Sequence, residues 1–461
     1  MHSIVMAQKI TIFVALLLIM PSLFVVYGAT IDGHEQNFVD REQSCHVCTA
    51  PKSHVVVALL DTGISPYHVV FRRPNMTQHP SAYIGGFPKN ALSLNLTFGR
   101  DYESDVTKDK NVWEKVKDRT LYWIPGTNIL AVSFGKFIKE GQYILDQQGH
   151  GTGTASVVAQ ENPDALILMI QTSDENLTEA LSWAVNQSWI DIISSQFFYK
   201  RSVTGSYPAW EDYPEIAKRG VENGKIIING AGNRRLPPWY SNVAGPPWII
   251  NVGGAENYSH GIDLKAACCT DYVSSFTRFI ANCKNTTHYW IGGGTSLSAP
   301  SVAGVFSSIL LKLRREYNYS HGIINNSLVY IPEEGIEITN HDIRNAVNHT
   351  AVYWHTFQWR PWKSLWWQLE VPWNPGYNPG PILEFLVNVI AGFLMKEIVS
   401  SNIPVNPVAP WLQMGWGFVN ESIVDESVDV LLGKKEMPEK PEGAIRYMEN
   451  IYHIRQKIWN G

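Results

Sequence analysis

The sequence carries little charge, and its charge is not concentrated in one sign. Charged residues make up 17% of the 461 residues, and the formal net charge is −5. No basic surface that would neutralise phosphates is expected, which excludes a nucleic-acid binder. Hydrophobic residues make up 45%, which excludes a disordered polymer and allows a sizeable core. The chain has no internal repeats, and its length suits one large domain or two to three ordinary ones.

Beyond the N-terminus, long hydrophobic runs are absent as well. The best later candidate, residues 382–395, is too short to span a membrane and carries two polar residues, so we expect a buried helix there. The N-terminal run ends in small residues before Ala29, which predicts a signal peptide over 1–28 and a secreted protein. If this peptide is not cleaved, residues 10–26 would anchor the chain in a membrane.

The sequence has ten Asn-X-Ser/Thr sequons, whereas roughly four are expected by chance from this composition. The excess predicts a glycosylated surface outside the cytoplasm. The sequon asparagines are Asn75, Asn95, Asn176, Asn186, Asn257, Asn285, Asn318, Asn325, Asn348 and Asn420.

Cysteine is scarce and odd in number. The five cysteines are Cys45, Cys48, Cys268, Cys269 and Cys283. The first two form a C-x-x-C, which is typical of a redox motif or of half a zinc site. No second C-x-x-C stands at metal spacing, so no metal site is predicted, and disulfides are the simpler interpretation in an exported chain. At least one thiol stays unpaired within the chain, and the spacing assigns no pairing.

From His54 onward, short apolar runs alternate with helical segments. Strands are predicted at 55–61, 165–171, 190–197, 225–232 and 248–255, and helices at 177–188 and in the stretch that follows His150. This order predicts an α/β fold with a doubly wound, mostly parallel sheet and helices on both faces. Ligand sites in such sheets lie at the carboxyl ends of the strands.

Two stretches interrupt this alternation and are predicted as insertions into one large domain over 54–433. Residues 72–140 are polar, aromatic and glycine-rich, and residues 351–411 are rich in tryptophan. For the second we favour a compact insertion with its own small core; the alternative is an aromatic wall beside a cleft or a contact to lipid headgroups. Residues 29–53 are a short N-terminal extension, and the charged tail over 434–461 is expected on the surface.

Four polar residues stand where the predicted strands end or a helix begins. Asp61 ends the first strand, His150 lies between two glycines, Asn233 follows the strand over 225–232, and Ser296 follows GGGT (292–295). Each alone has an ordinary explanation as a cap or turn residue. Together they supply a nucleophile, a base that takes its proton, a carboxylate that orients the base, and an amide donor for an oxyanion. The three glycines are expected to let a substrate backbone approach Ser296.

The segments that carry these residues resemble the four signature segments of the subtilisin-like serine peptidases, the subtilases. They read VALLDTGI (57–64), GHGTGTAS (149–156), NGAGN (229–233) and GGGTSLSAPSVAG (292–304), with Asp, His and Ser in the family's chain order. Weaker similarities at 183–196, 274–279, 343–351 and 415–426 extend the resemblance over about 54–433.

The resemblance implies an exported serine endopeptidase acting on polypeptides, with a catalytic domain over 54–433. Ser296 would form an acyl-enzyme with His150 as general base and acid, Asp61 as orienting residue and Asn233 in the oxyanion hole. The chemistry requires no cofactor; the family often binds structural calcium, but no acidic loop here maps onto such a site. The resemblance says nothing of the oligomeric state.

Two other functions stay open beside this one. A catalytically silent subtilase fold could serve in binding or as a scaffold, because the roughly 25 residues between Ala29 and the first strand are too few for the folding propeptide of many exported subtilases. An esterase would use the same side chains on another acyl donor.

The segment ISSQFFY (193–199) departs from the family's Ser-X-Gly, whose backbone pairs with substrate. A gapless alignment places Gln196 at the serine and Phe198 at the glycine, so Gln196, Phe197 and Phe198 are predicted to bind substrate. The Phe198 ring would restrict the specificity pocket to small side chains; alternatively, the strand rotates and buries it. Restriction is favoured because Phe197 supplies the apolar side chain for the opposite face.

Overall fold

The computed structural model describes residues 54–135, 143–197, 212–233, 243–258, 261–266, 270–324, 327–332, 337–353 and 414–460. All of them belong to one compact unit, Cys45–Gly461. The predicted signal peptide, the extension over 29–53, Phe198 and residues 354–411 of the tryptophan-rich stretch lie outside these ranges.

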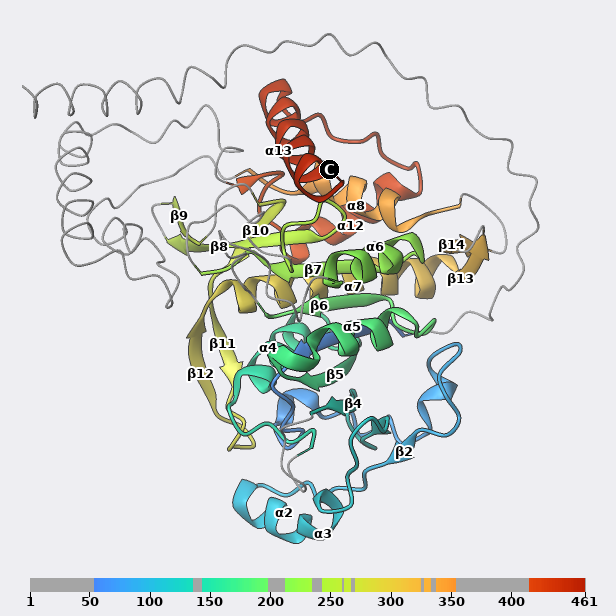
Figure 1. The fold of residues 1–461 in the computed structure, drawn as a ribbon, viewed down its shortest axis with the longest axis vertical. Helices are drawn as coiled ribbons and strands as arrows, with labels where there is room; N and C mark the ends of the chain where they lie inside the picture. Colours follow the sequence, from blue (N-terminus) through green and yellow to red (C-terminus); the bar gives the residue numbers. More distant parts are fainter. Residues whose placement is uncertain are drawn as a thin grey trace, which may run out of the picture. The chain divides into compact units, whose positions relative to one another are not determined.

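The described chain builds one large sheet with the strand order β10-β8-β7-β6-β1-β5-β4-β3-β2, and β9 pairs with β8 (Figure 1). All neighbours from β10 to β4 in this order are parallel, whereas β3 and β9 pair antiparallel with β4 and β8. The strands are β1 (Val56–Asp61), β2 (Leu92–Ser93), β3 (Tyr122–Trp123), β4 (Ile129–Phe134), β5 (Leu166–Thr172), β6 (Ile192–Ser195), β7 (Ile226–Gly230), β8 (Ile250–Tyr258), β9 (Gly261–Ala266) and β10 (Tyr272–Ser275). The predicted doubly wound α/β fold is confirmed.

Helices cover both faces of this sheet. On one face lie α4 (His150–Glu161) and α7 (Thr295–Tyr317), and on the other lie α5 (Leu177–Val185) and α6 (Tyr213–Glu222) (Figure 1). Side chains of β1 alternate between the two layers: Val57 and Leu59 pack on the α4 and α7 side, Val56 and Leu60 on the other. Burial on both faces explains why the sequence of this strand is apolar without a break.

Smaller elements complete the described unit. Its other helices are α2 (Tyr102–Lys108), α3 (Lys110–Trp113), α8 (Asn340–Thr350), α12 (Val424–Leu431) and α13 (Glu442–Asn460). Single 3-10 turns are η2 (Val69–Phe71), η3 (Pro80–Ala82), η4 (Asp174–Asn176) and η7 (Glu421–Ile423). Two hairpins are separate from the large sheet: β11 (Thr277–Ala281) with β12 (Tyr289–Gly293), and β13 (Tyr319–Ile324) with β14 (Ser327–Pro332).

The segment over 72–140, predicted as an insertion, contributes to the sheet itself. Its residues 129–134 form β4, which pairs with β5 from Ile129↔Ile167 to Phe134↔Thr172. All six residues of β4 are buried. The apolar run ILAVSF is short compared with the polar segment around it. The composition of the whole segment therefore gave no indication of this buried strand.

The expectation that the C-terminal tail lies on the surface is wrong for α13. Ala444, Met448, Ile451 and Arg455 are at most 5% exposed, at the spacing of one helical face. Arg455 is fully buried and pairs with Asp271 at 3.0 Å. The last helix is therefore packed against the rest of the described unit.

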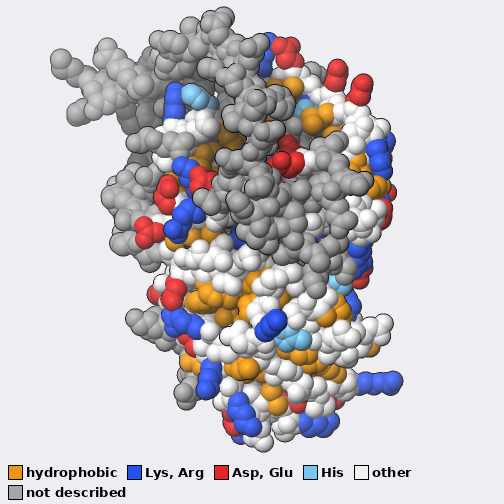
Figure 2. All heavy atoms as spheres, turned by 90° about the vertical axis from the view of Figure 1, so that its right-hand side faces the viewer, with side chains coloured by type: hydrophobic (Ala, Val, Ile, Leu, Met, Phe, Trp, Pro, Cys, Tyr) orange, Lys and Arg blue, Asp and Glu red, His pale blue; other side chains and the backbone are white. Residues whose placement is uncertain are grey.

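No span beyond the signal peptide was predicted, yet one described helix is long and apolar enough to cross a membrane. This is α7, and 83% of its most apolar window is buried in the fold, as in the core helix of a globular protein. Residues 382–395 lie outside the described ranges. On the described part of the face in Figure 2, acidic and basic side chains are interspersed.

Candidate active site

The fold brings three of the predicted residues into one hydrogen-bonded chain. Asp61 is the last residue of β1, His150 the first of α4 and Ser296 the second of α7. The Nδ1 atom of His150 lies 2.8 Å from Oδ1 of Asp61, and its Nε2 atom lies 3.0 Å from Oγ of Ser296. Both imidazole nitrogens are therefore engaged, one by a carboxylate and one by a hydroxyl.

The glycines on either side of His150 have separate local causes. Gly149 is the N-cap of α4 with a φ of 89°, which a side chain would strain. A Cβ atom on Gly151 would lie 2.1 Å from the carbonyl oxygen of Gly63, in the turn that follows Asp61. The close approach of these two backbones places the start of α4 against the end of β1.

Asp61 is held by more than His150. It is 1% exposed, and its Oδ1 atom accepts the Thr62 N–H at 2.7 Å while Oδ2 accepts the Thr154 hydroxyl at 2.8 Å. The negative charge of Asp61 is the largest cause that raises the pKa of His150 above its usual value. Thr154 was not predicted, although it stands one helical turn after His150 and thus on the same face of α4.

Asn233 is held at the start of α7, next to Thr295. Its Oδ1 atom accepts the Thr295 N–H at 2.7 Å and the Thr295 hydroxyl at 3.2 Å, which directs the amide nitrogen away from Thr295. A Cβ atom on Gly294 would lie 3.1 Å from Ser296 Oγ and 3.3 Å from Asn233 Nδ2. The N–H of Ser296 belongs to the first turn of α7, where no helical partner exists. The Asn233 amide and the Ser296 hydroxyl thus both lie near Gly294, and the N–H of Ser296 has no partner within the helix.

Of the three glycines before Thr295, Gly294 is the one that lies near the Ser296 hydroxyl. Gly292 and Gly293 belong to β12, and added Cβ atoms would lie 2.8 Å from Ile280 Cδ1 and 3.1 Å from the Phe276 ring, respectively. Gly292 and Gly293 thus allow close packing around the hairpin, whereas Gly294 lies near Ser296. That the three glycines make room for a substrate backbone stays a prediction.

Two of the three predicted substrate-binding residues are described. Gln196 extends β6, since its N–H donates to the Leu60 carbonyl at 3.3 Å, and its side chain donates to the Ser194 hydroxyl at 2.8 Å. Phe197 is half-buried and packs against the core on the α5 and α6 side. Phe198 lies outside the described residues, so its predicted role in the pocket stays a prediction.

Cys283 is a free, buried thiol, whereas the other four cysteines lie outside the described ranges. Burial raises the pKa of the Cys283 thiol. Its Sγ atom lies close to the turn before His150, since a Cβ atom on Gly149 would be 3.2 Å from it. Among the described residues, no group of three or more His, Cys, Asp or Glu side chains could hold a metal ion.

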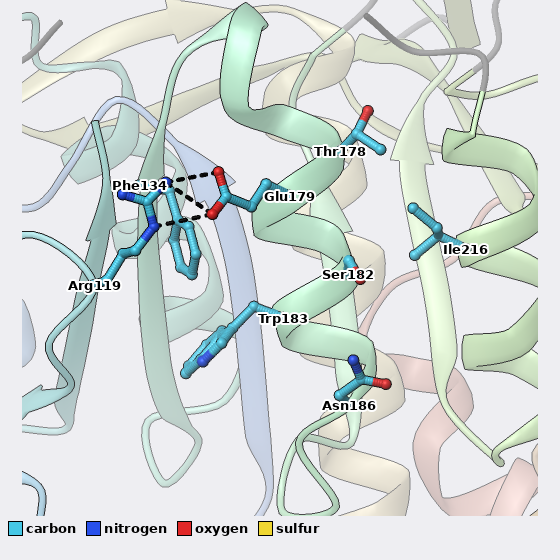
Figure 3. Close-up of a pocket in the computed structure, with 8 residues that line it drawn as sticks. All are labelled: Arg119, Phe134, Thr178, Glu179, Ser182, Trp183, Asn186 and Ile216. Atoms are coloured by element: carbon cyan, nitrogen blue, oxygen red, sulfur yellow. Dashed lines mark hydrogen bonds and ion pairs between the residues drawn. The ribbon is translucent and has the colours of Figure 1, made fainter. Parts of the chain in front are cut away.

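A cavity of about 550 Å³ lies over α5 and is separate from this hydrogen-bonded chain. Figure 3 shows Arg119 and Glu179 paired at its edge, beside Phe134 and Trp183. None of the predicted site residues lines this cavity. It is therefore not the cleft in which a substrate would reach Ser296.

Residues 52–365 match the model of the subtilase family. This match covers more than half of the chain and includes all four residues around the candidate site. Among curated protein sequences, none matches.

The chain is also similar to solved structures at low sequence identity. They include a lanthipeptide protease (15% identity, 66% of this chain and 81% of that chain, TM-score 0.42) and the prenylagaramide maturation protease PagA (13%, 82% and 95%, 0.41). A third is the epidermin leader peptide processing serine protease EpiP from Staphylococcus aureus (11%, 83% and 77%, 0.42).

Proposed function

The chain belongs to the subtilase family of serine-type peptidases, and we propose that it is an exported endopeptidase that uses Ser296 as its nucleophile. The observation that carries this proposal is the hydrogen-bonded chain from Asp61 through His150 to Ser296, with distances of 2.8 and 3.0 Å. Polypeptides are the substrates.

In the first half of the reaction, Ser296 Oγ attacks the scissile carbonyl carbon as His150 Nε2 takes the hydroxyl proton. Asp61, buried and held by two further donors, keeps the imidazole oriented and stabilises the imidazolium that forms. His150 then gives the proton to the leaving amine, and an acyl-enzyme remains on Ser296.

The tetrahedral intermediate carries its negative charge on the former carbonyl oxygen. The amide nitrogen of Asn233 and the N–H of Ser296 donate to that oxygen. Thr295 supports this step because it occupies Oδ1 of Asn233, so that the nitrogen end of the amide is presented to the substrate. In the second half, His150 activates a water that hydrolyses the acyl-enzyme, and no cofactor takes part.

A fluorophosphonate probe and a denatured protein substrate test the proposal together. We expect the wild-type chain to be labelled and to cleave, and Ser296→Ala to do neither while unfolding at the same temperature. His150→Ala should lose nearly as much activity. Undiminished cleavage by Ser296→Ala would exclude Ser296 as the nucleophile.

The same assays separate the two alternative functions. A silent scaffold would not react with the probe at all. An esterase would be labelled and would hydrolyse a simple ester, but it would leave the denatured protein intact.

We further propose that the signal peptide is cut near Gly28 and that the chain is secreted and glycosylated. Asn75, Asn95, Asn186 and Asn318 are exposed, so these sequons are accessible to glycosylation. Asn176 is only 6% exposed and is expected to stay unmodified. N-terminal sequencing of native material should begin close to Ala29, and glycopeptide mass spectrometry should find the exposed sites occupied. Retention of Met1 without glycans would contradict export.

A further inference from the structure

A second buried carboxylate lies in the turn before His150 and takes no part in the mechanism above. Asp146 is 1% exposed. Its Oδ1 atom accepts the N–H groups of Gln148 and Gly149 at 2.9 and 2.8 Å. Its Oδ2 atom accepts the N–H and the hydroxyl of Thr152 at 2.8 and 2.6 Å. One side chain thus binds the backbone on both sides of His150.

A further bond connects Asp146 to the turn that carries Asp61. Thr62 donates its hydroxyl to Asp146 Oδ1 at 3.1 Å, and the same hydroxyl accepts the Gly151 N–H at 2.9 Å. Thr62 and Gly151 are the direct chain neighbours of the orienting carboxylate and of the imidazole. Asp146 therefore fixes the relative position of two residues that lie 89 positions apart in the sequence.

The segment that presents Asp146 is itself in a strained conformation. Ile144 has a φ of 72°, which is unfavourable for a β-branched residue. It is held from both sides, because its N–H donates to Gln171 Oε1 at 2.6 Å and its carbonyl accepts the Ile64 N–H at 2.8 Å. Such strain persists only where the surroundings determine the conformation, and it is common beside active sites.

The bonding pattern also defines the chemical state of Asp146. Each carboxylate oxygen accepts at least one backbone N–H, so the ionised form satisfies every donor around it. Asp61 and Asp146 are the two charged groups that raise the pKa of His150, with Asp61 the larger cause. The Asp146 carboxylate thus acts on the imidazole through its charge, while its hydrogen bonds within the described residues go to other groups.

From these contacts we propose that Asp146 is a positioning residue for the peptidase reaction, holding His150 in line between Asp61 and Ser296. The inference rests on the proposed function. Asp146 acts through the backbone of the turn and through Thr62, and it contacts neither the substrate nor the reacting atoms.

Asp146→Asn tests this role in the full-length enzyme. The amide keeps the volume but replaces one acceptor oxygen by a donor that faces the Thr152 N–H or the Gly149 N–H. We expect kcat to fall by about 10- to 100-fold, as for a slightly misplaced catalytic group, with little change in KM. The acid limb of the pH profile of kcat/KM should move to lower pH, because the variant lacks one charge that favours the imidazolium.

A pair of substitutions at Thr62 separates geometry from charge. Thr62→Val removes the hydroxyl link but leaves the Asp146 charge, so kcat should fall while the acid limb stays at the wild-type pH. Thr62→Ser keeps the hydroxyl and should restore kcat. These variants also test the proposal if Asp146→Asn does not fold.

Asp191→Asn is the matched control. Asp191 is a buried carboxylate that accepts the Val56 N–H at 2.8 Å and pairs with Arg314, at the amino ends of β1 and β6, opposite the site. We expect it to lower stability but to leave kcat per folded molecule unchanged. The proposal would be overturned if Asp146→Asn kept the wild-type kcat and the wild-type position of the acid limb. It would also be overturned if Asp146→Asn and Asp191→Asn lost the same amount of kcat per folded molecule. If the wild-type enzyme itself neither reacts with the probe nor cleaves, the proposed function has failed instead.

Discussion

The docking of the C-terminal helix α13 depends on one arginine, and Arg455→Ala measures how much. The buried guanidinium pairs with Asp271 at 3.0 Å. It also donates to the carbonyl oxygens of Gly245 at 2.8 Å and of Pro246 and Ile249 at 2.6 Å each. A weaker bond reaches the Ala244 carbonyl at 3.5 Å. The substitution removes all five interactions at once and leaves a cavity of the size of the side chain.

The expected loss in the free energy of unfolding follows from the buried groups that lose Arg455 as a partner in the Arg455→Ala variant. Breaking a buried ion pair from one side costs about 3–5 kcal/mol, because the other charge stays buried. Asp271 keeps its bonds to Arg344 at 2.9 Å and to the Asn251 N–H at 2.9 Å, which favours the lower end of that range. The carbonyl groups that accept from Arg455 lose this donor as well, although that of Pro246 keeps the Ile249 N–H at 3.1 Å. We therefore expect a loss of about 3 kcal/mol in the free energy of unfolding.

Urea unfolding of the wild-type and variant chains, followed by circular dichroism, measures this loss. Arg446→Ala is the matched control, because Arg446 lies on the same helix with its side chain 71% exposed and, within the described part of the chain, paired with Glu442 alone. That variant should lose less than about 1 kcal/mol, as is usual for exposed pairs. A loss below about 1 kcal/mol for Arg455→Ala would refute the reasoning, since it would mean that α13 contributes nothing through this contact.

The same contact predicts a dependence on pH. Burial by itself raises the pKa of Asp271, but the charges of Arg455 and Arg344 hold it below its usual value. A carboxyl whose pKa is lowered in the folded state stabilises the fold above its unfolded pKa of about 4, and this contribution is lost as the pH falls further. The difference in the free energy of unfolding between wild type and Arg455→Ala should therefore become smaller as the pH falls below about 4.

Four further predictions concern the site. The Asp61 carboxylate raises the pKa of His150, so kcat/KM should fall with decreasing pH through an apparent pKa above the usual 6.5. An acid limb of the pH profile below that value would contradict the role of His150 as the base. Asn233→Ala should lower kcat by about 10²- to 10³-fold with KM nearly unchanged, and a change in KM alone would remove Asn233 from the oxyanion hole. Gly151→Ala should abolish activity and destabilise the fold, because its Cβ atom would lie 2.1 Å from the Gly63 carbonyl oxygen, as activity assays and thermal unfolding would show. Phe198→Gly should raise kcat/KM more for peptides with a large residue before the scissile bond than for those with Ala or Gly, whereas a uniform loss would identify Phe198 as a core residue.

The sequence was most informative where a feature depends on near neighbours along the chain. The apolar run before Asp61 and the helical spacing after His150 each identified an element, because strand and helix periodicities are local properties. The four segments with Asp61, His150, Asn233 and Ser296 also predicted the candidate site, since the side chains that this chemistry needs are few and distinctive. The fold brings three of these residues into one hydrogen-bonded chain.

The tertiary structure alone decided the features that join distant segments. Nothing near Arg455 in the sequence indicates a partner at Asp271, because a lone arginine in a charged helix is ordinarily solvated. Likewise, nothing near Asp146 in the sequence indicates that the Thr62 hydroxyl donates to it, because the two residues lie far apart along the chain. The physical reason is that local pattern determines which residues face inward, whereas the choice of buried polar partner is made only when helices and strands pack together.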